Sequence, residues 1–378
     1  MIPMPYPRAI VLIVLTAVTL AGSVPERVPI HKEQQIVASA ADSGAWPYLA
    51  FPALLDRGEE ILVSYKRARS HAQDPGAALD LLRLDPISGR ASGRRALAQL
   101  DGHIMQMGEW VRFPNGDIAN YIDAQVPGSP TTRAGLRVVR STDGGKNFGA
   151  LERVGVIDGV EYGYAFDAIT EGNTTWMLVM TFANLPGGKH APPARVPAGS
   201  VDVIRTEDNG RTWRFVRNLS REFGDVPINE SAFIRSGDGF LVTSRGYDSR
   251  ERLHLTDGDF QLRRQTDLTA KHSFITSHVG RPRLLARDGQ VYLLGRNVSE
   301  KGKPMQLGLF RLELAALSVA SYATLDNAEL ANVGDGYYAM AYFRGEGAET
   351  RLHVITYKSL RPQPPDLVRL SFHWDEVK

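Results

Sequence analysis

The chain of 378 residues contains no cysteine, so it has no disulfide and no cysteine for lipid attachment. Such a chain tolerates an oxidising compartment without depending on it. An excess of one charge is also missing, because 44 Lys and Arg residues stand against 42 Asp and Glu residues, for a formal net charge of +2. Proteins that bind nucleic acid usually carry a basic patch or stripe, so this sequence predicts no nucleic-acid partner.

Long hydrophobic runs are absent except at the N-terminus. Residues 9–22 read AIVLIVLTAVTLAG, follow the basic Arg8 and are followed by Ser23, which is the pattern of a secretory signal peptide. We therefore expect a signal peptide over residues 1–23, a polar tether over 24–45, and a periplasmic or secreted protein that binds no membrane once the signal is removed. An uncleaved N-terminal anchor is the alternative.

Long amphipathic helices are missing as well, whereas 36 glycines and 22 prolines supply many turns. A pattern of apolar strand, glycine turn and second strand recurs six times, with turn glycines 47 to 67 residues apart. These are Gly58, Gly116, Gly172, Gly239, Gly289 and Gly336. Each interval can hold a four-stranded antiparallel sheet, and six such sheets bury their faces against one another in a propeller. We predict an all-β, six-bladed β-propeller over residues 46–378, with a β-sandwich as the alternative.

Two short stretches share one turn motif, with Asp, Gly and a final aromatic residue at fixed positions. They are STDGGKNF (141–148) and TEDNGRTW (206–213). Asp143 and Asp208 can accept backbone N–H bonds inside their own turns, and Gly145 and Gly210 supply a positive φ. With Trp213 packed under its turn, we assign these residues a structural role. The stretches at Asp85 and Asp257 look like weaker copies.

Paired turns of this kind, called Asp-boxes, on a six-fold repeat resemble the sialidase (neuraminidase) superfamily of BNR-repeat proteins. The resemblance implies that the boxes lie on the face opposite the active site, which is formed where the first residues of the innermost strands meet. It also implies a glutamate paired with a tyrosine nucleophile, three arginines that hold a sugar carboxylate, and a loop aspartate as acid/base.

The best match to these residues lies in NESAFIRSGDGFLVTSRG, where Glu230 corresponds to the catalytic glutamate and Arg245 to one arginine. Asp74, in the loop after the first hairpin, corresponds to the acid/base aspartate, and His71 of the same loop is a second catalytic candidate.

Other positions depart from the family pattern. Ala50 stands where the first arginine is expected, and no arginine occurs over residues 303–305, where the third is expected. The nucleophile position, nine residues before Gly336, falls among residues 327–329, and we place Tyr337 and Tyr338 on the second strand of the last blade. Additional residues near the strand starts or in the first loop are predicted to bind substrate: Lys66, Arg67, Glu109, Tyr164, His278, Arg281, Arg283 and Glu329.

Cations, carboxylates and aromatic rings together suit an acidic carbohydrate. We expect an exo-acting glycoside hydrolase on acidic or decorated glycans that works as a monomer. A uronate lyase with a His or Tyr base, or a glycan-binding propeller without activity, are the alternatives. Histidines are scattered and no zinc, EF-hand, P-loop or dinucleotide motif occurs, so we predict no metal and no cofactor.

Overall fold

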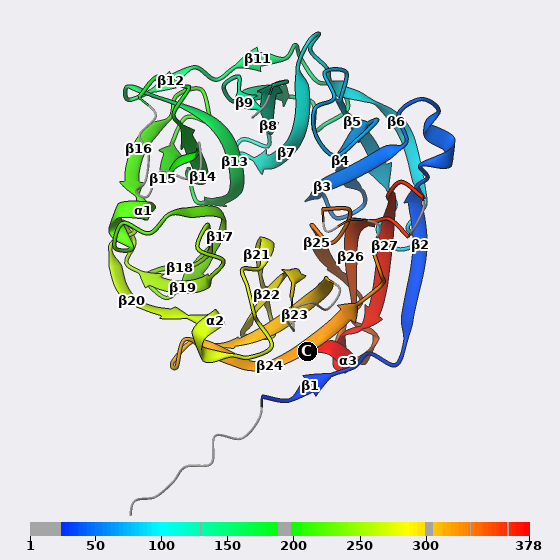
Figure 1. Ribbon diagram of the computed structural model, residues 1–378, viewed down its shortest axis with the longest axis vertical. Coiled ribbons are helices and arrows are strands. Elements are labelled where there is room, and N and C mark those ends of the chain that lie inside the picture. Colours follow the sequence, from blue (N-terminus) through cyan, green and yellow to red (C-terminus); the bar gives the residue numbers. More distant parts are fainter. Residues whose placement is uncertain are drawn as a thin grey trace, which may run out of the picture.

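Six antiparallel sheets stand around a central axis in the computed structural model, like the blades of a propeller (Figure 1). The structure describes residues 24–128, 131–187, 198–298, 305–330, 332, 334–360 and 363–378. The predicted six-bladed β-propeller is confirmed. The predicted signal peptide, residues 1–23, lies outside the described residues.

Each blade has four strands that follow one another from the axis outwards. The innermost strands are β3 (Tyr48–Asp56), β7 (Ile104–Arg112), β13 (Val160–Glu171), β17 (Ile228–Ser236), β21 (Gly280–Arg287) and β25 (Met340–Arg344). The second strands are β4 (Ile61–Ala68), β8 (Ile118–Val126), β14 (Thr174–Phe182), β18 (Gly239–Gly246), β22 (Gln290–Asn297) and β26 (Arg351–Lys358). The third strands are β5 (Ala78–Leu84), β10 (Arg137–Ser141), β15 (Ala198–Thr206), β19 (Glu251–Thr256), β23 (Gln306–Glu313) and β27 (Asp366–His373). The outer strands are β6 (Ala91–Ala98), β11 (Glu152–Arg153), β16 (Arg214–Asn218), β20 (Leu262–Asp267), β24 (Ser318–Asp326) and β2 (Lys32–Ala38).

Short elements complete the blades. Three two-residue strands pair with the sheets: β1 (Glu26–Arg27) with β24, β9 (Thr132–Arg133) with β8, and β12 (Val156–Ile157) with β13. The helices are α1 (Leu219–Glu222), α2 (Leu268–Lys271), α3 (Trp374–Val377) and the 3₁₀ turns η1 (Ala41–Ser43) and η2 (Gly347–Glu349). Within the described ranges, no helix is long and apolar enough to cross a membrane.

The N-terminal segment closes the ring, which corrects the expected polar tether over residues 24–45. Strand β2 pairs along its length with β27 and so becomes the outer strand of the last blade. The Lys32 ammonium also donates to Asp326 at 2.6 Å, at the end of β24 in the preceding blade. The outer strand of a blade is half exposed and needs few apolar residues, so the polar sequence of this segment did not reveal a strand.

Aromatic contacts join neighbouring blades. Trp176 of the third blade lies 5.6 Å from Phe240 of the fourth, measured between ring centroids. Trp213 donates its indole N–H to the Tyr121 hydroxyl of the second blade at 3.1 Å. Large rings at these seams bury much apolar area, so each blade depends on its neighbours for its core.

The predicted turn glycines belong to the first hairpin in five of the six blades, and the sixth prediction is wrong. Gly336 precedes β25, and the turn between β25 and β26 instead contains Gly345 and Gly347, both at positive φ. Moving the turn by nine or more residues changes the strand that follows Gly336. Tyr338 therefore lies just before the innermost strand and not on the second one.

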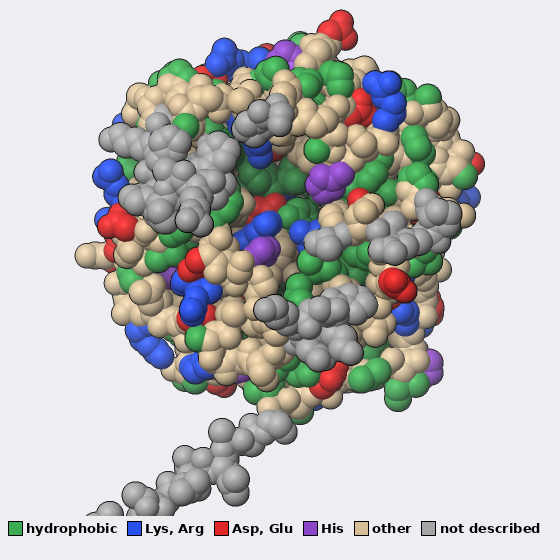
Figure 2. Space-filling model, in the orientation of Figure 1, with side chains coloured by type: hydrophobic (Ala, Val, Ile, Leu, Met, Phe, Trp, Pro, Cys, Tyr) green, Lys and Arg blue, Asp and Glu red, His purple; other side chains and the backbone are tan. Residues whose placement is uncertain are grey.

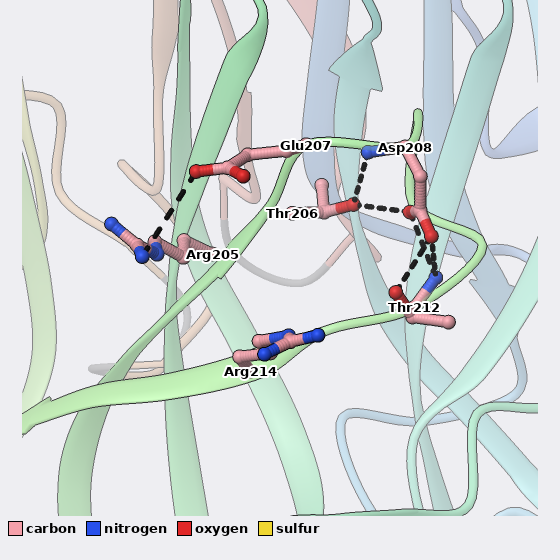
Figure 3. A pocket seen from close by; sticks show the side chains of 6 residues that line it. All are labelled: Arg205, Thr206, Glu207, Asp208, Thr212 and Arg214. Carbon is pink, nitrogen blue, oxygen red and sulfur yellow. Dashed lines mark hydrogen bonds and ion pairs between the residues drawn. The ribbon is translucent and has the colours of Figure 1, made fainter.

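The two Asp-box turns join the third and outer strands of blades two and three, as predicted. Asp208 accepts hydrogen bonds from the Thr212 amide at 2.9 Å and from the Thr206 hydroxyl at 2.8 Å, while Gly210 has a φ of 74° (Figure 3). The Asn209 side chain accepts from the Asn115 amide in the first hairpin turn of blade two at 3.3 Å. The boxes therefore lie at the end of the propeller that carries the hairpin turns, away from the starts of the innermost strands.

The Asp143 turn repeats these bonds. Its carboxylate accepts from the Asn147 amide at 3.0 Å and from the Ser141 hydroxyl at 2.7 Å, and Gly145 has a φ of 84°. In blades one and four, Asp85 and Asp257 cap turns at the same place in the sheet.

Candidate active site

A cavity of about 300 Å³ lies at the axis where the innermost strands begin. Figure 2 shows the molecule hollowed at its centre, with cationic, acidic and histidine side chains gathered in the hollow. Its walls include three arginines, two carboxylates and a histidine, together with aromatic rings. They are Arg133, Arg245, Arg296, Asp123, Glu230, His71, Phe51, Tyr164, Phe182, Tyr247 and Tyr338.

Irregular pairing aims these side chains. In the first five blades, the register between the innermost and second strands shifts near the start, for example between Ala50 and Ala53 and between Ile228 and Ser231. Phe51 lies in one such shift with a φ of 55°, a backbone region that side chains other than glycine rarely adopt. Bulges of this kind re-aim side chains and are common beside active sites.

Glu230, Tyr338 and Arg245 form a hydrogen-bonded triangle at the cavity. The Tyr338 hydroxyl donates to Glu230 Oε2 at 2.9 Å and accepts from Arg245 Nη1 at 2.8 Å. Arg245 also forms an ion pair with Glu230. These three residues come from β17, β18 and the segment just before β25, so the predicted pair of Glu230 and Arg245 is brought together and a tyrosine joins it.

Opposing influences act on the pKa of Glu230. Its burial raises the pKa, but the nearby charges of Arg245 and Arg281 and the hydrogen bonds to the carboxylate outweigh burial and lower the pKa to about 2. Glu230 is therefore ionised at neutral pH. Burial and the charge of Glu230 raise the pKa of Tyr338, so that this hydroxyl keeps its proton until a base removes it.

Tyr338 is the residue that sequence reasoning misplaced. A turn at Gly336 predicts the tyrosine position among residues 327–329, which include Glu329. In the structure Glu329 is exposed in the connection between β24 and β25 and does not line the cavity. A second glycine-rich turn at GEGAE, residues 345–349, was the signal that could have moved the strand and found Tyr338.

Arg296 was also missed. It ends β22 within the stretch LLGRN, and its guanidinium lies over the Tyr338 ring, 4.5 Å from the ring centroid. The sequence predicted the third arginine position at residues 303–305, of which Lys303 and Pro304 lie outside the described residues. Two cavity arginines, Arg245 and Arg296, thus flank Tyr338.

Asp74 does not line the cavity, which corrects its expected acid/base role. The carboxylate accepts from the Arg69 amide at 2.5 Å, from the Arg69 guanidinium at 3.2 Å and from the Gly76 amide at 3.3 Å. It is buried and shapes its own loop. These bonds agree with the alternative interpretation, in which an Asp before Pro shapes a turn.

His71, from the same loop, does reach the cavity. Its ring makes an edge contact with Phe51 at 5.2 Å between centroids, and Nδ1 lies 2.8 Å from the Tyr48 hydroxyl. Partial removal of the ring from water and then the charge of Lys66 lower the pKa of His71 below its ordinary value. Histidine is thus the loop residue that the structure offers for proton transfer.

Lys66 and Arg67 lie outside the cavity. The Lys66 ammonium is fully buried and donates to the His71 carbonyl and to Gln106 Oε1, each at 2.7 Å, and burial lowers its pKa to about 7. Arg67 pairs with Asp80 at 2.9 Å inside the first blade. Both were expected to bind substrate, but their charged groups are satisfied by the protein.

Arg281, Arg283 and Glu109 form a buried ion cluster among the inner strands. Glu109 pairs with Arg281 at 2.8 Å and with Arg283 at 2.5 Å, and Arg283 pairs with Asp167 at 3.1 Å. Arg281 supports the cavity from beneath, because its amide donates to Glu230 Oε2 at 3.2 Å. These three residues, predicted to bind substrate, are paired with one another and are not among the residues that line the cavity.

Of the two remaining predicted binding residues, Tyr164 lines the cavity and His278 does not. Tyr164 lines the cavity, and its hydroxyl donates to Glu230 Oε1 at 3.1 Å. His278 precedes β21 and is not among the residues that line the cavity; burial and then the charge of Arg245 lower its pKa to about 4.

Asp123 and Arg133 form a second charged pair in the cavity that sequence reasoning did not single out. They lie 2.8 Å apart, on β8 and β9, and burial raises the pKa of Asp123 although Arg133 lowers it in part. The Arg133 guanidinium lies 4.5 Å from the Phe182 ring centroid. In the parts of the chain that the structure describes, no cluster of three or more His, Cys, Asp or Glu could hold a metal ion.

Neither a protein-family model nor a curated protein sequence matches this chain. Its fold is similar to a protein of unknown function from Dyadobacter fermentans, with a TM-score of 0.69 and 15% identity over 92% of this chain and 98% of that one. The K499G mutant of NanB sialidase from Streptococcus pneumoniae gives a TM-score of 0.62 and 10% identity over 91% of this chain and 71% of that one. A Penicillium chrysogenum alpha-L-arabinanase complexed with arabinobiose gives a TM-score of 0.59 and 10% identity over 91% of this chain and 99% of that one.

At these identities the likeness shows the fold alone. The chain has a sialidase-like propeller fold, and its structural neighbours include glycoside hydrolases of this architecture.

Proposed function

We propose that the protein is a secreted glycoside hydrolase that removes a terminal acidic sugar from a glycan, with Tyr338 as the nucleophile. The observation that carries the proposal is the triangle of Tyr338, Glu230 and Arg245 at the cavity. A nucleophile within hydrogen-bond reach of its base is the usual arrangement for covalent catalysis, and tyrosine serves as nucleophile in some glycosidases. Secretion rests on the signal-like residues 1–23.

An acidic sugar is favoured by the charges at the cavity. Arg245 and Arg296 come from adjacent blades and flank Tyr338, and guanidinium groups match a carboxylate in geometry and charge. A cavity of about 300 Å³ is at the small end of the range for ligand sites, which suits one sugar unit and hence an exo-acting enzyme.

The chemistry takes two displacement steps. In the first, the Tyr338 oxygen bonds to the anomeric carbon while its proton passes to Glu230, and the leaving oxygen takes a proton from His71. In the second, water attacks the anomeric carbon and gives a proton to His71, while the departing Tyr338 oxygen recovers its proton from Glu230. The sum is hydrolysis with retained anomeric configuration.

His71 is chosen as the proton donor over two carboxylates. Asp74 is held by its own loop, and Asp123 has a side chain with no exposed surface that pairs with Arg133. His71 lines the cavity and remains exposed to it.

The test is a panel of aryl glycosides of sialic acid, hexuronic acids and neutral sugars, assayed with wild type, Tyr338→Phe and Glu230→Gln. We expect release from at least one acidic glycoside, retention of configuration by proton NMR, and loss of turnover in both variants. An unsaturated, ultraviolet-absorbing uronate product would instead indicate a lyase. Binding of acidic sugars without turnover would indicate a glycan-binding propeller.

A further inference from the structure

Three hydrogen-bonded side chains, those of Asp335, Tyr48 and His71, connect a buried carboxylate to the cavity. The Tyr48 hydroxyl donates to Asp335 Oδ1 at 2.8 Å and lies 2.8 Å from His71 Nδ1. Tyr48 begins β3 in the first blade, whereas Asp335 precedes β25 in the last one. These hydrogen bonds therefore cross the seam between the first and last blades, at which the propeller closes.

The two ends of this set of hydrogen-bonded side chains are held in place. Asp335 is 6% exposed, and its second oxygen accepts from the Asn332 amide group at 2.6 Å. Its backbone carbonyl accepts from the Ser359 amide at 3.0 Å. At the other end, the His71 ring packs so closely on Gly334 that a Cβ there would lie 2.8 Å from His71 Cε1.

The hydrogen bonds fix which imidazole nitrogen carries a proton. A phenol has one hydrogen, and a carboxylate only accepts, so the Tyr48 hydrogen belongs to Asp335. Burial and the neighbouring Tyr357 and Asp335 raise the pKa of Tyr48, which keeps this hydroxyl protonated. The Tyr48 oxygen can then only accept from His71, so Nδ1 is the protonated nitrogen.

We propose that Tyr48 and Asp335 are positioning residues that hold His71 with Nδ1 protonated and Nε2 available to exchange a proton with substrate. This deepens the proposed function and rests on it. The arrangement follows the general rule that an acid or base histidine is oriented by a partner on its other nitrogen. It also explains how a histidine can take the acid/base role in a loop whose aspartate, Asp74, shapes the backbone.

Charged groups on every side of His71 set its titration. Burial lowers the pKa of His71 most, Lys66 on β4 and Arg296 on β22 lower it further, and Asp335 and a hydrogen bond with the Gly334 backbone raise it. Tyr48 lies between the ring and Asp335. Asp335 is the carboxylate that supports the imidazolium, and removing its charge should lower the pKa of His71 further.

The experiment compares Tyr48→Phe with a matched control, Tyr65→Phe. Tyr65 is a buried tyrosine on β4 whose hydroxyl finds no hydrogen-bond partner among the described residues. Imidazole ¹⁵N NMR of wild type, with His71 assigned by His71→Gln, should show Nδ1 protonated in the neutral ring. Tyr48→Phe should move both His71 ¹⁵N signals toward the other tautomer and lower kcat/KM roughly tenfold or more, up to the 10²–10⁴ that a general acid contributes. Tyr65→Phe should change neither.

Asp335→Asn supplies the second arm. It keeps an oxygen for the Tyr48 hydroxyl but removes the charge, so the His71 NMR titration and the alkaline limb of kcat/KM should both move to lower pH. Unmoved ¹⁵N signals in Tyr48→Phe and an unmoved titration in Asp335→Asn would overturn the proposal. The NMR measurement needs no substrate. A wild type without turnover would therefore contradict the proposed function, while the NMR data would still test the positioning of His71 by Tyr48 and Asp335.

Discussion

The two ends of the propeller use aspartate and glutamate in opposite ways. At the hairpin end, Asp208 accepts bonds from Thr206 and Thr212, all within one turn. At the cavity end, Glu230 accepts from Tyr338, 108 residues away, and from Arg245 on another strand. A carboxylate whose hydrogen bonds come from its own turn stabilises local structure. A carboxylate whose hydrogen bonds come from several blades has these bonds only when the ring is closed. Under the proposed function, the hairpin end contributes stability and the cavity end contributes the chemistry.

The largest expected effect is at the cavity end, in two adjacent tyrosines. Tyr338→Phe should lower kcat at least about 10³-fold, because loss of a nucleophile leaves only the residual catalysis from binding and electrostatics. Tyr337→Phe is the matched control: its hydroxyl donates to Asp326 of the preceding blade at 2.9 Å and does not line the cavity. It should destabilise the fold by about 1–2 kcal/mol and leave kcat unchanged. Steady-state kinetics and thermal unfolding of both variants would separate the roles, and equal kinetics would contradict the assignment of Tyr338.

Next in size is the preference for an acidic sugar. Arg296→Met should reduce kcat/KM for the acidic glycoside roughly 10- to 100-fold, since a hydrogen bond to a charged group is worth about 1.5–3 kcal/mol. A neutral glycoside of the same leaving group should lose little. The ratio of the two kcat/KM values measures the effect, and an equal loss on both substrates would mean that Arg296 does not hold the carboxylate.

The pH dependence should follow His71. Its pKa is lowered below the ordinary value of about 6.5, and the protonated ring is the active form in the first step. Activity should therefore be high at acidic pH and fall about tenfold per unit as pH rises through a midpoint below 6.5. In the free enzyme Glu230, with a pKa of about 2, stays ionised over this pH range. A profile of kcat/KM that rises toward neutral pH would contradict this assignment.

The smallest effect belongs to the hairpin end. Asp208→Ala should lower the free energy of unfolding by roughly 1 kcal/mol, as for the loss of a side-chain cap, and leave kcat/KM unchanged. Although burial raises the pKa of Asp208, hydrogen bonds from Thr212 and Thr206 lower it to about 2. The stabilisation is thus present above about pH 4 and lost as pH falls toward 2. Urea unfolding at pH 7 and pH 3 measures it; a stability difference between wild type and variant that grew at pH 3 would contradict it.

Prediction from the sequence succeeded where neighbours in the chain make the interactions. The Asp-box turns, five of the six first hairpins and the six-fold repeat all depend on residues within a few positions of one another. Glu230 and Arg245 were also found, because they lie on two strands joined by one tight turn. Tyr338 and Arg296 were missed since each required the correct strand boundaries in the last two blades.

Asp74 and His71 show the same limit within one loop. Both are polar residues in SHAQDPG, and either could have faced the axis. Asp74 is held by Arg69 and the loop backbone, which lie within the loop, whereas His71 is contacted from outside it by Tyr48 and the Gly334 segment of the last blade. A pattern within the loop contains no information about those distant partners.

The sequence alone determined the architecture of this protein, because repeated strands, glycine turns and Asp-boxes are local features that recur with each blade. It also located the candidate site, with its polar residues, where the innermost strands begin. Only the tertiary structure decided which of them face one another. Ring closure by β2 and the turn after β25 bring the first and last blades together, so that Asp335 of the last blade acts on the pKa of His71 in the first. The pKa of Glu230 likewise depends on Arg281 from the neighbouring blade.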